Sequence, residues 1–331
     1  MTHTRAHTNA LALYALLLFA AMSAPAQDVA AGERPKPAQT VLLNVMVTDG
    51  KGHTVAGVKR EDLRLYVDGV EQPITYFSNE GRPVSYGLVV DNSGSLRHQI
   101  NYVLAAAKLI LNHNGPEDET FVLRFINSKN ITVVREFTAD TALLGRALDA
   151  MYVQGGQTAL IDALYLSAEY LTEKARPAEA GARLRALVLI SDGEDRQSRY
   201  KAEDLFKLLG QSGVQVFCIG LVGELENDTG FAARGKRDKA KAFLERLASQ
   251  TGGRVSFVLK TSELEEAVNE VAEDLHAQLV LGFTPPQSMK GDAPHKIEVK
   301  VVSRPGGGKL KAVTRPEITL AVQNGAEGQK R

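Results

Sequence analysis

Three oxygen-bearing side chains stand at alternate positions directly after a strongly apolar stretch of the chain. The stretch covers residues 84 to 90, and the side chains that follow it belong to Asp91, Ser93 and Ser95. Carboxylate and hydroxyl oxygens suit Mg²⁺, Mn²⁺ and Ca²⁺, which are cations that prefer oxygen ligands. One carboxylate and two neutral hydroxyls leave a divalent ion short of negative charge. A metal site at this position therefore needs further donors from elsewhere in the chain.

Two other polar residues stand where they could supply those donors. Thr158 follows the glycine pair Gly155 and Gly156 and opens an apolar-periodic run at residues 159 to 171. Asp192 closes a second apolar stretch that starts at residue 186. The spacing places both residues at loop positions, but it does not by itself bring them together. The competing interpretation of the first loop is a polar turn that caps the following helix.

The five donors together resemble the metal-ion-dependent adhesion site of von Willebrand factor type A domains. They are Asp91, Ser93, Ser95, Thr158 and Asp192. The match consists of an Asp-x-Ser-x-Ser loop, a Thr after a Gly-rich loop and an Asp-Gly pair, and it covers residues 84 to 278; Ser191 stands where many relatives carry Thr. The resemblance implies that the three hydroxyls bind Mg²⁺ or Mn²⁺ directly, with Ca²⁺ less expected, and that the carboxylates bind it directly or through water. An Asp or Glu carboxylate of a partner protein would then displace a bound water.

Several nearby residues are candidates for the rim of that site. Glu194 and Asp195 follow the last donor and are either rim acids or solvated loop charges. Residues 223 to 237 are long for a strand-to-helix loop, and they leave the same edge of the expected sheet. We expect them to form either a partner-binding rim with Phe231 as an apolar anchor, or a mobile charged loop.

Strand and helix patterns alternate through the middle of the chain, which predicts a mainly parallel α/β sheet. The resemblance implies that this sheet is doubly wound and of the Rossmann-like, von Willebrand type A class. Strands are expected at residues 84–90, 120–125, 131–137, 184–190, 214–221 and 254–259, and helices at 96–111, 141–152, 159–171, 202–209, 239–249 and 263–275. The second and third strands are expected to pair as an antiparallel edge hairpin. The resemblance implies the strand order 3-2-1-4-5-6, in which the strands that precede Asp91 and Asp192 are neighbours at the reversal of the order. Open α/β sheets bind their ligands at this point.

Strand-rich segments flank this unit on both sides. Expected strands lie at residues 41–48, 63–67 and 72–77 before it, and at 279–283, 296–302, 309–313 and 318–322 after it. Neither flank has enough strands for a stable sheet sandwich of its own. We expect one small β domain built from both flanks, with the α/β unit inserted in it. Two separate small sheets packed on the insert are the alternative.

The predicted organisation of the whole chain starts with an export signal. Residues 1–26 read as a signal peptide because a basic start and a short apolar core precede Ala24-Pro25-Ala26. An uncleaved anchor is the alternative. A disordered linker is expected at residues 27–39 and a disordered tail at 324–331. Between them we expect N-terminal strands of the small β domain at 40–80, the type A domain at 84–278 and C-terminal strands of the small β domain at 279–323. No other segment is long and apolar enough for a membrane span.

Composition narrows the class of function. The chain of 331 residues has 39 basic and 39 acidic residues, no Trp and 6% aromatic residues, which argues against a nucleic-acid surface. Its single cysteine, Cys218, lies in an apolar run and reads as an inert buried thiol. An exported chain without a disulfide fits a bacterial periplasm or cell surface, or a secreted protein.

The sequence thus predicts an exported, metal-dependent protein-binding module that is not an enzyme. A metal-assisted hydrolase is the catalytic alternative, for which only Glu194 or Asp195 offers a general base. An envelope assembly subunit with a purely structural ion is the third interpretation. The oligomeric state is not predicted.

Overall fold

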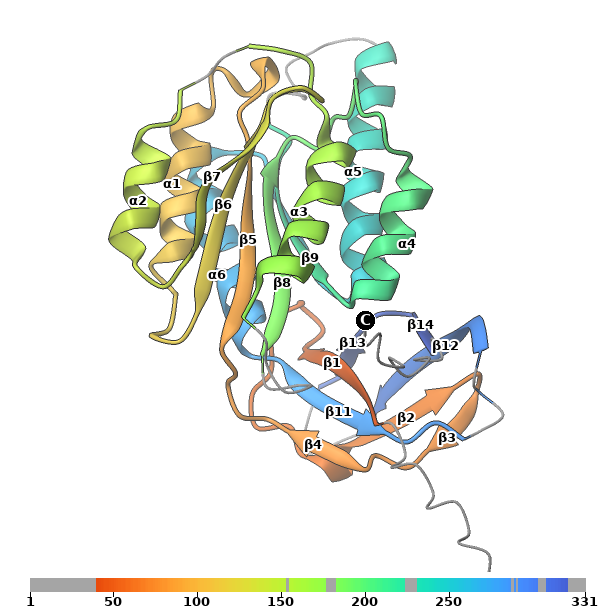
Figure 1. Ribbon diagram of the computed structural model, residues 1–331. Coiled ribbons are helices and arrows are strands. Elements are labelled where there is room, and N and C mark those ends of the chain that lie inside the picture. Colours follow the sequence, from red (N-terminus) through yellow and green to blue (C-terminus); the bar gives the residue numbers. More distant parts are fainter. Residues whose placement is uncertain are drawn as a thin grey trace, which may run out of the picture. The chain divides into compact units, whose positions relative to one another are not determined.

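A six-stranded sheet forms the centre of the α/β unit (Figure 1). The computed structural model describes residues 40–152, 155–176, 183–223, 231–286, 289, 291–302 and 308–320. The strands of this sheet are β5 (Val84–Asp91), β6 (Glu119–Phe125), β7 (Ile131–Thr138), β8 (Leu184–Ser191), β9 (Gln215–Leu221) and β10 (Val255–Val258). Their order is β10-β9-β8-β5-β6-β7, and only the edge pair β6–β7 is antiparallel. The predicted fold, strand order and edge hairpin are confirmed.

Helices cover both faces of this sheet. One face packs against α1 (Ile100–Leu111), α2 (Thr141–Asp149) and α6 (Leu264–His276), and the other against α3 (Leu160–Lys174), α4 (Ala202–Ser212) and α5 (Phe231–Thr251). The central strand β5 is buried along all eight of its residues, with Tyr86 and Leu88 in one core and Val89 in the other. Burial on both faces explains why its sequence is continuously apolar instead of alternating.

The flanking segments form two four-stranded antiparallel sheets. Their orders are β13-β1-β11-β4 and β14-β12-β2-β3. The strands are β1 (Val41–Thr48), β2 (Leu63–Val67), β3 (Val70–Gln72), β4 (Tyr76–Ser78), β11 (Leu279–Phe283), β12 (Gly291–Val301), β13 (Lys311–Val313) and β14 (Glu317–Leu320). Each sheet mixes strands from before and after the α/β unit. Both sheets contribute to one core, which includes Leu43, Leu65, Phe283 and Val299. This sharing resolves the shortage of strands in each flank.

The structure corrects two expected elements. Residues 72–77 do not form one hairpin strand: β3 pairs with β2, whereas β4 pairs with β11 in the other sheet. Pro73 lies between them and has no N–H to donate to a ladder, so the strand breaks there. The expected loop at residues 223–237 is also too long, because α5 already begins at Phe231. Ala232, Ala233 and Arg234 favour helix and extend α5 towards its N-terminus.

The expected signal peptide, linker and tail lie outside the described residues. Within the part of the chain that the structure describes, no helix is both long and apolar enough to cross a bilayer.

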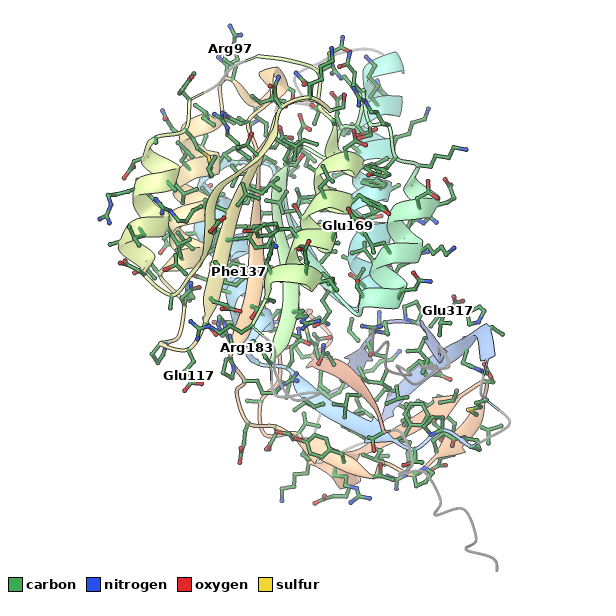
Figure 2. The ribbon with its side chains drawn as sticks, viewed as in Figure 1. Arg97, Glu117, Phe137, Glu169, Arg183 and Glu317 are labelled. Carbon is green, nitrogen blue, oxygen red and sulfur yellow. The ribbon has the colours of Figure 1, made fainter. Side chains whose placement is uncertain are left out.

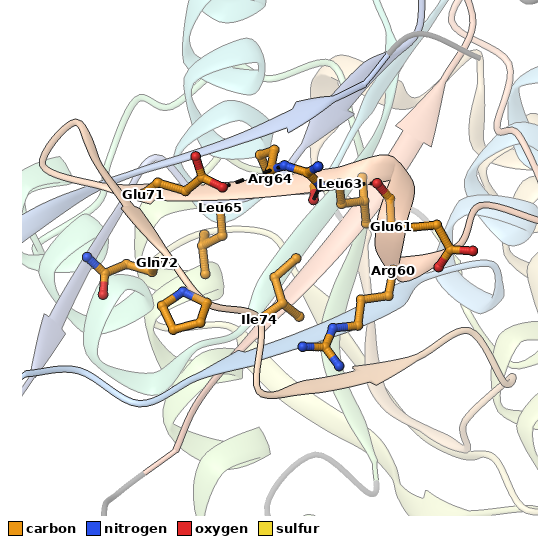
Figure 3. Close-up of a pocket in the computed structure, with 9 residues that line it drawn as sticks. Arg60, Glu61, Leu63, Arg64, Leu65, Glu71, Gln72 and Ile74 are labelled. Carbon is orange, nitrogen blue, oxygen red and sulfur yellow. Dashed lines mark hydrogen bonds and ion pairs between the residues drawn. The ribbon is translucent and has the colours of Figure 1, made fainter. Parts of the chain in front are cut away.

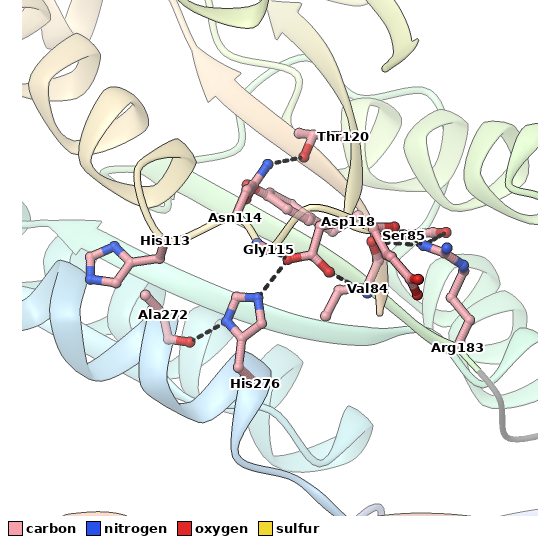
Figure 4. A network of polar contacts seen from close by, with 12 residues as sticks. Val84, Ser85, His113, Asn114, Gly115, Asp118, Thr120, Arg183, Ala272 and His276 are labelled. Carbon is pink, nitrogen blue, oxygen red and sulfur yellow. Dashed lines mark hydrogen bonds and ion pairs between the residues drawn. The ribbon is translucent and has the colours of Figure 1, made fainter. Parts of the chain in front are cut away.

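A buried polar network joins the first strand of the α/β unit to its last helix (Figure 4). The carboxylate of Asp118 accepts hydrogen bonds from the backbone N–H groups of Val84 and Gly115, each at 2.7 Å, and contacts Nε2 of His276 at 2.9 Å. Nδ1 of His276 lies 2.8 Å from the carbonyl oxygen of Ala272. Because both ring nitrogens face acceptors, the doubly protonated ring satisfies this arrangement best.

We expect the stability conferred by His276 to fall as the pH rises through the raised pKa of this side chain. Burial acts to lower the pKa of His276, but the hydrogen bonds to Asp118 and Ala272 raise it overall. A raised folded-state pKa gives stability that is complete below the unfolded value of about 6.5 and is lost as the pH passes the folded value. His276→Gln should cost about 1 kcal/mol below that point and little at high pH. Denaturant unfolding of both proteins across the pH range measures the difference; a cost that does not vary with pH would contradict a charged ring.

Candidate metal centre

The carboxyl ends of β5 and β8 lie side by side at the point where the strand order reverses. The two strands pair in parallel, with Val90 opposite Ile190. The chain goes from β5 to β6 and β7 on one side and returns to β8 on the other. Loops that leave these two strands therefore diverge around a crevice, which is where open α/β sheets bind ligands.

The structure brings the five predicted donors together at that edge. The hydroxyl of Thr158 donates to Oγ of Ser93 at 3.0 Å, although the two residues are 65 positions apart. Oγ of Ser93 lies 3.0 Å from Oγ of Ser95, and the Ser95 side chain hydrogen-bonds to Asp192. Hydrogen bonds thus connect three separate loops into one cluster of oxygen atoms.

Asp91 connects the cluster to the ends of strands β5 and β8. Its side chain is fully buried; Oδ1 accepts the backbone N–H of Ser93 at 3.0 Å, and Oδ2 accepts the hydroxyl of Ser191 at 2.6 Å. Sequence reasoning gave Ser191 no role, although it directly precedes Asp192. Oγ of Ser191 also accepts the N–H of Gly193 at 3.0 Å, so this hydroxyl links the two aspartate loops.

The electrostatics of the cluster favour a bound cation. Burial, followed by repulsion from Asp192, raises the pKa of Asp91 to about 7. Burial also raises the pKa of Asp192, and the nearby charge of Glu194 acts in the same direction, while Arg196 opposes it. Two buried carboxylates close together cost free energy unless a positive charge lies between them. A divalent cation would remove that cost, so the donor set fits a metal ion.

The chemistry of the donors indicates which kind of ion. Within the described residues no three His, Cys, Asp or Glu side chains gather as a metal site. The cluster instead combines two carboxylates with three hydroxyls. An all-oxygen set is typical of Mg²⁺, Mn²⁺ or Ca²⁺ and disfavours metals that prefer sulfur or imidazole ligands.

Two glycines allow the Thr158 loop to approach the Asp91 loop. Gly155 and Gly156 have φ angles of +68° and +150°, which side chains rarely permit. A Cβ on Gly156 would lie 2.6 Å from Cγ2 of Ile126. The Gly156 carbonyl oxygen accepts the N–H of Gly94 at 3.3 Å, which ties the loops directly together.

The acidic rim candidates lie beside the cluster, and each is engaged. Glu194 is 7% exposed and forms an ion pair with Arg196. The carboxylate of Asp195 accepts the N–H of Ile161 at 3.2 Å and the hydroxyl of Ser198 at 2.5 Å. Phe231 is the first residue of α5, but its side chain lies outside the described part of the structure.

A separate hollow lies on the flanking sheets and does not include any donor. Its volume is about 550 Å³, and its walls come from the β2–β3 hairpin, the preceding turn and the chain after β3 (Figure 3). Arg64 in this hollow pairs with Glu71 at 3.5 Å and donates to the backbone carbonyl groups of Glu61 and Leu63. Arg64, one of the two cations in the hollow, thus already has an acidic partner.

Comparison with solved structures finds similar chains at low identity. An aerotolerance-related membrane protein from Bacteroides fragilis is 20% identical, with a TM-score of 0.44 and coverage of 57% of this chain and 98% of its own. BatB from Bacteroides thetaiotaomicron is 18% identical, with a TM-score of 0.42 and coverage of 58% and 98%. The manganese-loaded TRAP protein of Plasmodium vivax is 16% identical, with a TM-score of 0.45 and coverage of 74% and 97%.

Comparison with curated proteins finds no match. The family model of the von Willebrand factor type A domain matches residues 87–270, which is more than half of the chain and contains all five donors. The chain belongs to the von Willebrand factor type A domain family.

Proposed function

We propose that this protein is an exported protein-binding module that uses a divalent ion to hold an acidic side chain of its partner. Mg²⁺ or Mn²⁺ is the proposed ion, and the periplasm or cell surface is the proposed location. The signal-like composition of residues 1–26 supports export. Family membership supports a binding role over a catalytic one.

One observation carries the proposal. Five oxygen donors from three loops lie in one hydrogen-bonded cluster at the reversal point of the sheet, and its two carboxylates are buried. Ser93, Ser95 and Thr158 would hold the ion through their hydroxyls, while Asp91 and Asp192 would supply the negative charge. The ion, when bound, offers an open coordination position to a carboxylate from outside. Ser191 keeps Asp91 oriented towards the cluster through its hydrogen bond.

We expect the ion to stabilise the folded protein. At a free ion concentration tenfold above the dissociation constant, the free energy of unfolding should rise by about 1.4 kcal/mol. The double variant Ser93→Ala/Ser95→Ala should lose this increment, whereas Ser249→Ala, which changes an exposed serine of α5, should keep it. Thermal unfolding with Mg²⁺, with Mn²⁺ and with chelator measures the effect. Coincident melting curves for the wild type under all three conditions would argue against the metal site.

Metal-dependent capture from an envelope extract tests the binding role. The wild type should retain a partner with Mg²⁺ and release it with chelator, and the double serine variant should retain none. Retention that survives chelation would favour the structural-subunit alternative. The hydrolase alternative is not favoured, because the carboxylates it requires at Glu194 and Asp195 are already engaged by Arg196 and by Ile161 and Ser198.

A further inference from the structure

One exposed arginine lies beside the loops of the metal site. Arg97 is exposed and follows the donor Ser95 by two residues. Its Nη2 atom lies 3.4 Å from the position that a Cβ of Gly155 would take, so the guanidinium group rests against the Thr158 loop. Figure 2 shows Arg97 at the end of the α/β unit opposite Glu117 and Arg183, with its side chain directed outward. Among the described residues it has no ion pair or side-chain hydrogen bond.

A second cation belongs to the same side of the site. Lys129 is exposed in the turn between β6 and β7, which leaves the same edge of the sheet as β5. Ile126, in that turn, packs against Gly156. The described part of the structure gives the Lys129 ammonium group no acidic partner either. The Gly155–Gly156 turn therefore lies against both the Arg97 loop and the Lys129 turn.

The acids of this edge that the structure describes have other partners. Asp192 accepts hydrogen bonds from the Ser95 side chain and the Glu194 N–H, Glu194 pairs with Arg196, and Asp195 is engaged by Ile161 and Ser198. The three acids lie in the loop after β8, and their partners come from that loop, from the Asp91 loop (Ser95) and from the first turn of α3 (Ile161). Within the described residues the two sides of the site thus differ: the acids after β8 already have partners, whereas Arg97 and Lys129 have no acidic partner.

An exposed aromatic residue adjoins the same side. Tyr152 is 63% exposed, and its backbone carbonyl oxygen accepts a hydrogen bond from Nδ2 of Asn92 at 2.7 Å. Asn92 is itself fully buried between two of the donors, so the backbone of Tyr152 is fixed relative to the cluster. Tyr and Arg at fixed positions are the residue types most often found at the energetic centre of protein interfaces.

We propose that the partner presents an acidic segment with two carboxylates, one for the ion and a second one for Arg97. This inference rests on the proposed function and specifies its partner. The segment crosses the site towards Tyr152 and Lys129, away from the paired loop after β8. Lys129 attracts negative charge without fixing its position. The planar guanidinium group of Arg97 would bind the second carboxylate through two hydrogen bonds, at a set distance from the carboxylate that binds the ion.

Selection from a library of random linear peptides tests the specificity. The full chain is immobilised with Mg²⁺, and bound peptides are released with chelator. Peptides released from the wild type should share two acidic residues at a constant spacing. Peptides released from Arg97→Glu should keep the first acid and carry Lys or Arg at the second position, because the reversed charge selects the opposite sign.

Affinity measurements complete the test. A peptide selected by the wild type should bind Arg97→Glu about tenfold more weakly and Arg97→Gln a few-fold more weakly. Arg146→Glu, which reverses an exposed charge on α2, should bind it as the wild type does. The Mg²⁺-induced shift in melting temperature should persist in both Arg97 variants, which shows that they fold and bind the ion.

The outcomes separate the inference from the proposed function. If Arg97→Glu selects the same peptides as the wild type, or binds them with equal affinity, the role of Arg97 is wrong while the metal-bridged contact stands. If chelator releases no peptide from the wild type, the proposed function fails and the inference fails with it.

Discussion

In the presence of chelator, Asp91→Asn is expected to be more stable than the wild type, and in saturating Mg²⁺ it is expected to be less stable. The substitution keeps the shape of the side chain and leaves an oxygen to accept the N–H of Ser93. Its amide group faces Ser191, whose hydroxyl can turn to accept from it. What the variant loses is a buried negative charge next to Asp192.

The buried charge explains why the variant should be the more stable protein without metal and the less stable one with metal. Without metal, burial and Asp192 raise the pKa of Asp91 to about 7, so at higher pH the wild type carries two buried charges that repel each other. Removing one should raise the free energy of unfolding by about 1 kcal/mol or more. With the ion at a hundredfold its dissociation constant, the wild type gains about 2.7 kcal/mol. The variant, which lacks one carboxylate, gains much less.

Denaturant unfolding of both proteins at one alkaline pH, with Mg²⁺ and with chelator, measures all four values. Ser191→Ala is a useful companion, because it removes the hydrogen bond to Asp91 but keeps its charge. That variant should retain part of the response to metal. If Asp91→Asn is less stable than the wild type even in chelator, the carboxylate contributes more through its hydrogen bonds than it costs through its charge.

The sequence predicted four of the donors because they follow strand patterns, and it predicted Thr158 because this residue lies between a glycine pair and a helical pattern. Continuous apolar residues identified β5 and β8 as strands buried on both faces, and their ends placed Asp91 and Asp192 at one edge of a parallel sheet. The strand order, however, came from the family resemblance. Periodicity alone does not say which strands are neighbours, and hence does not bring Thr158 to Ser93.

Other features of the site depend on contacts that leave no pattern in the sequence. The role of Ser191 arises from a hydroxyl that reaches across to the neighbouring strand end. Arg97 looks like any surface arginine until the Gly155 turn is seen beside it. The break at Pro73 was readable from the missing N–H, but the transfer of β4 to the other sheet was not. All three features depend on contacts between residues that are far apart in the sequence.

A buried ion pair lies where the α/β unit meets the flanking strands. Arg254, just before β10, pairs with Asp274 of α6, and the two side chains are 18% and 2% exposed. Arg254 also donates to the carbonyl oxygen of Gly52, and the hydroxyl of Thr54 donates to Asp274. Gly52 and Thr54 follow β1, so this group ties the flanking sheets to the last helix of the α/β unit.

Arg254→Met should therefore cost about 3–5 kcal/mol of unfolding free energy, because it leaves the Asp274 carboxylate buried without its cation. Burial already raises the pKa of Asp274, against the effects of Thr54 and Arg254, and without Arg254 it should rise further. The Asp274 carboxyl group then favours folding only while it is protonated, so the cost should grow as the pH rises.

The double variant Arg254→Met/Asp274→Leu removes both charges and should recover much of the loss, whereas Arg146→Met on the surface of α2 should change stability by less than about 0.5 kcal/mol. Denaturant unfolding at acidic and alkaline pH measures the whole cycle. Equal costs for the single and double variants would mean that packing of the arginine side chain, and not its charge, holds this junction together.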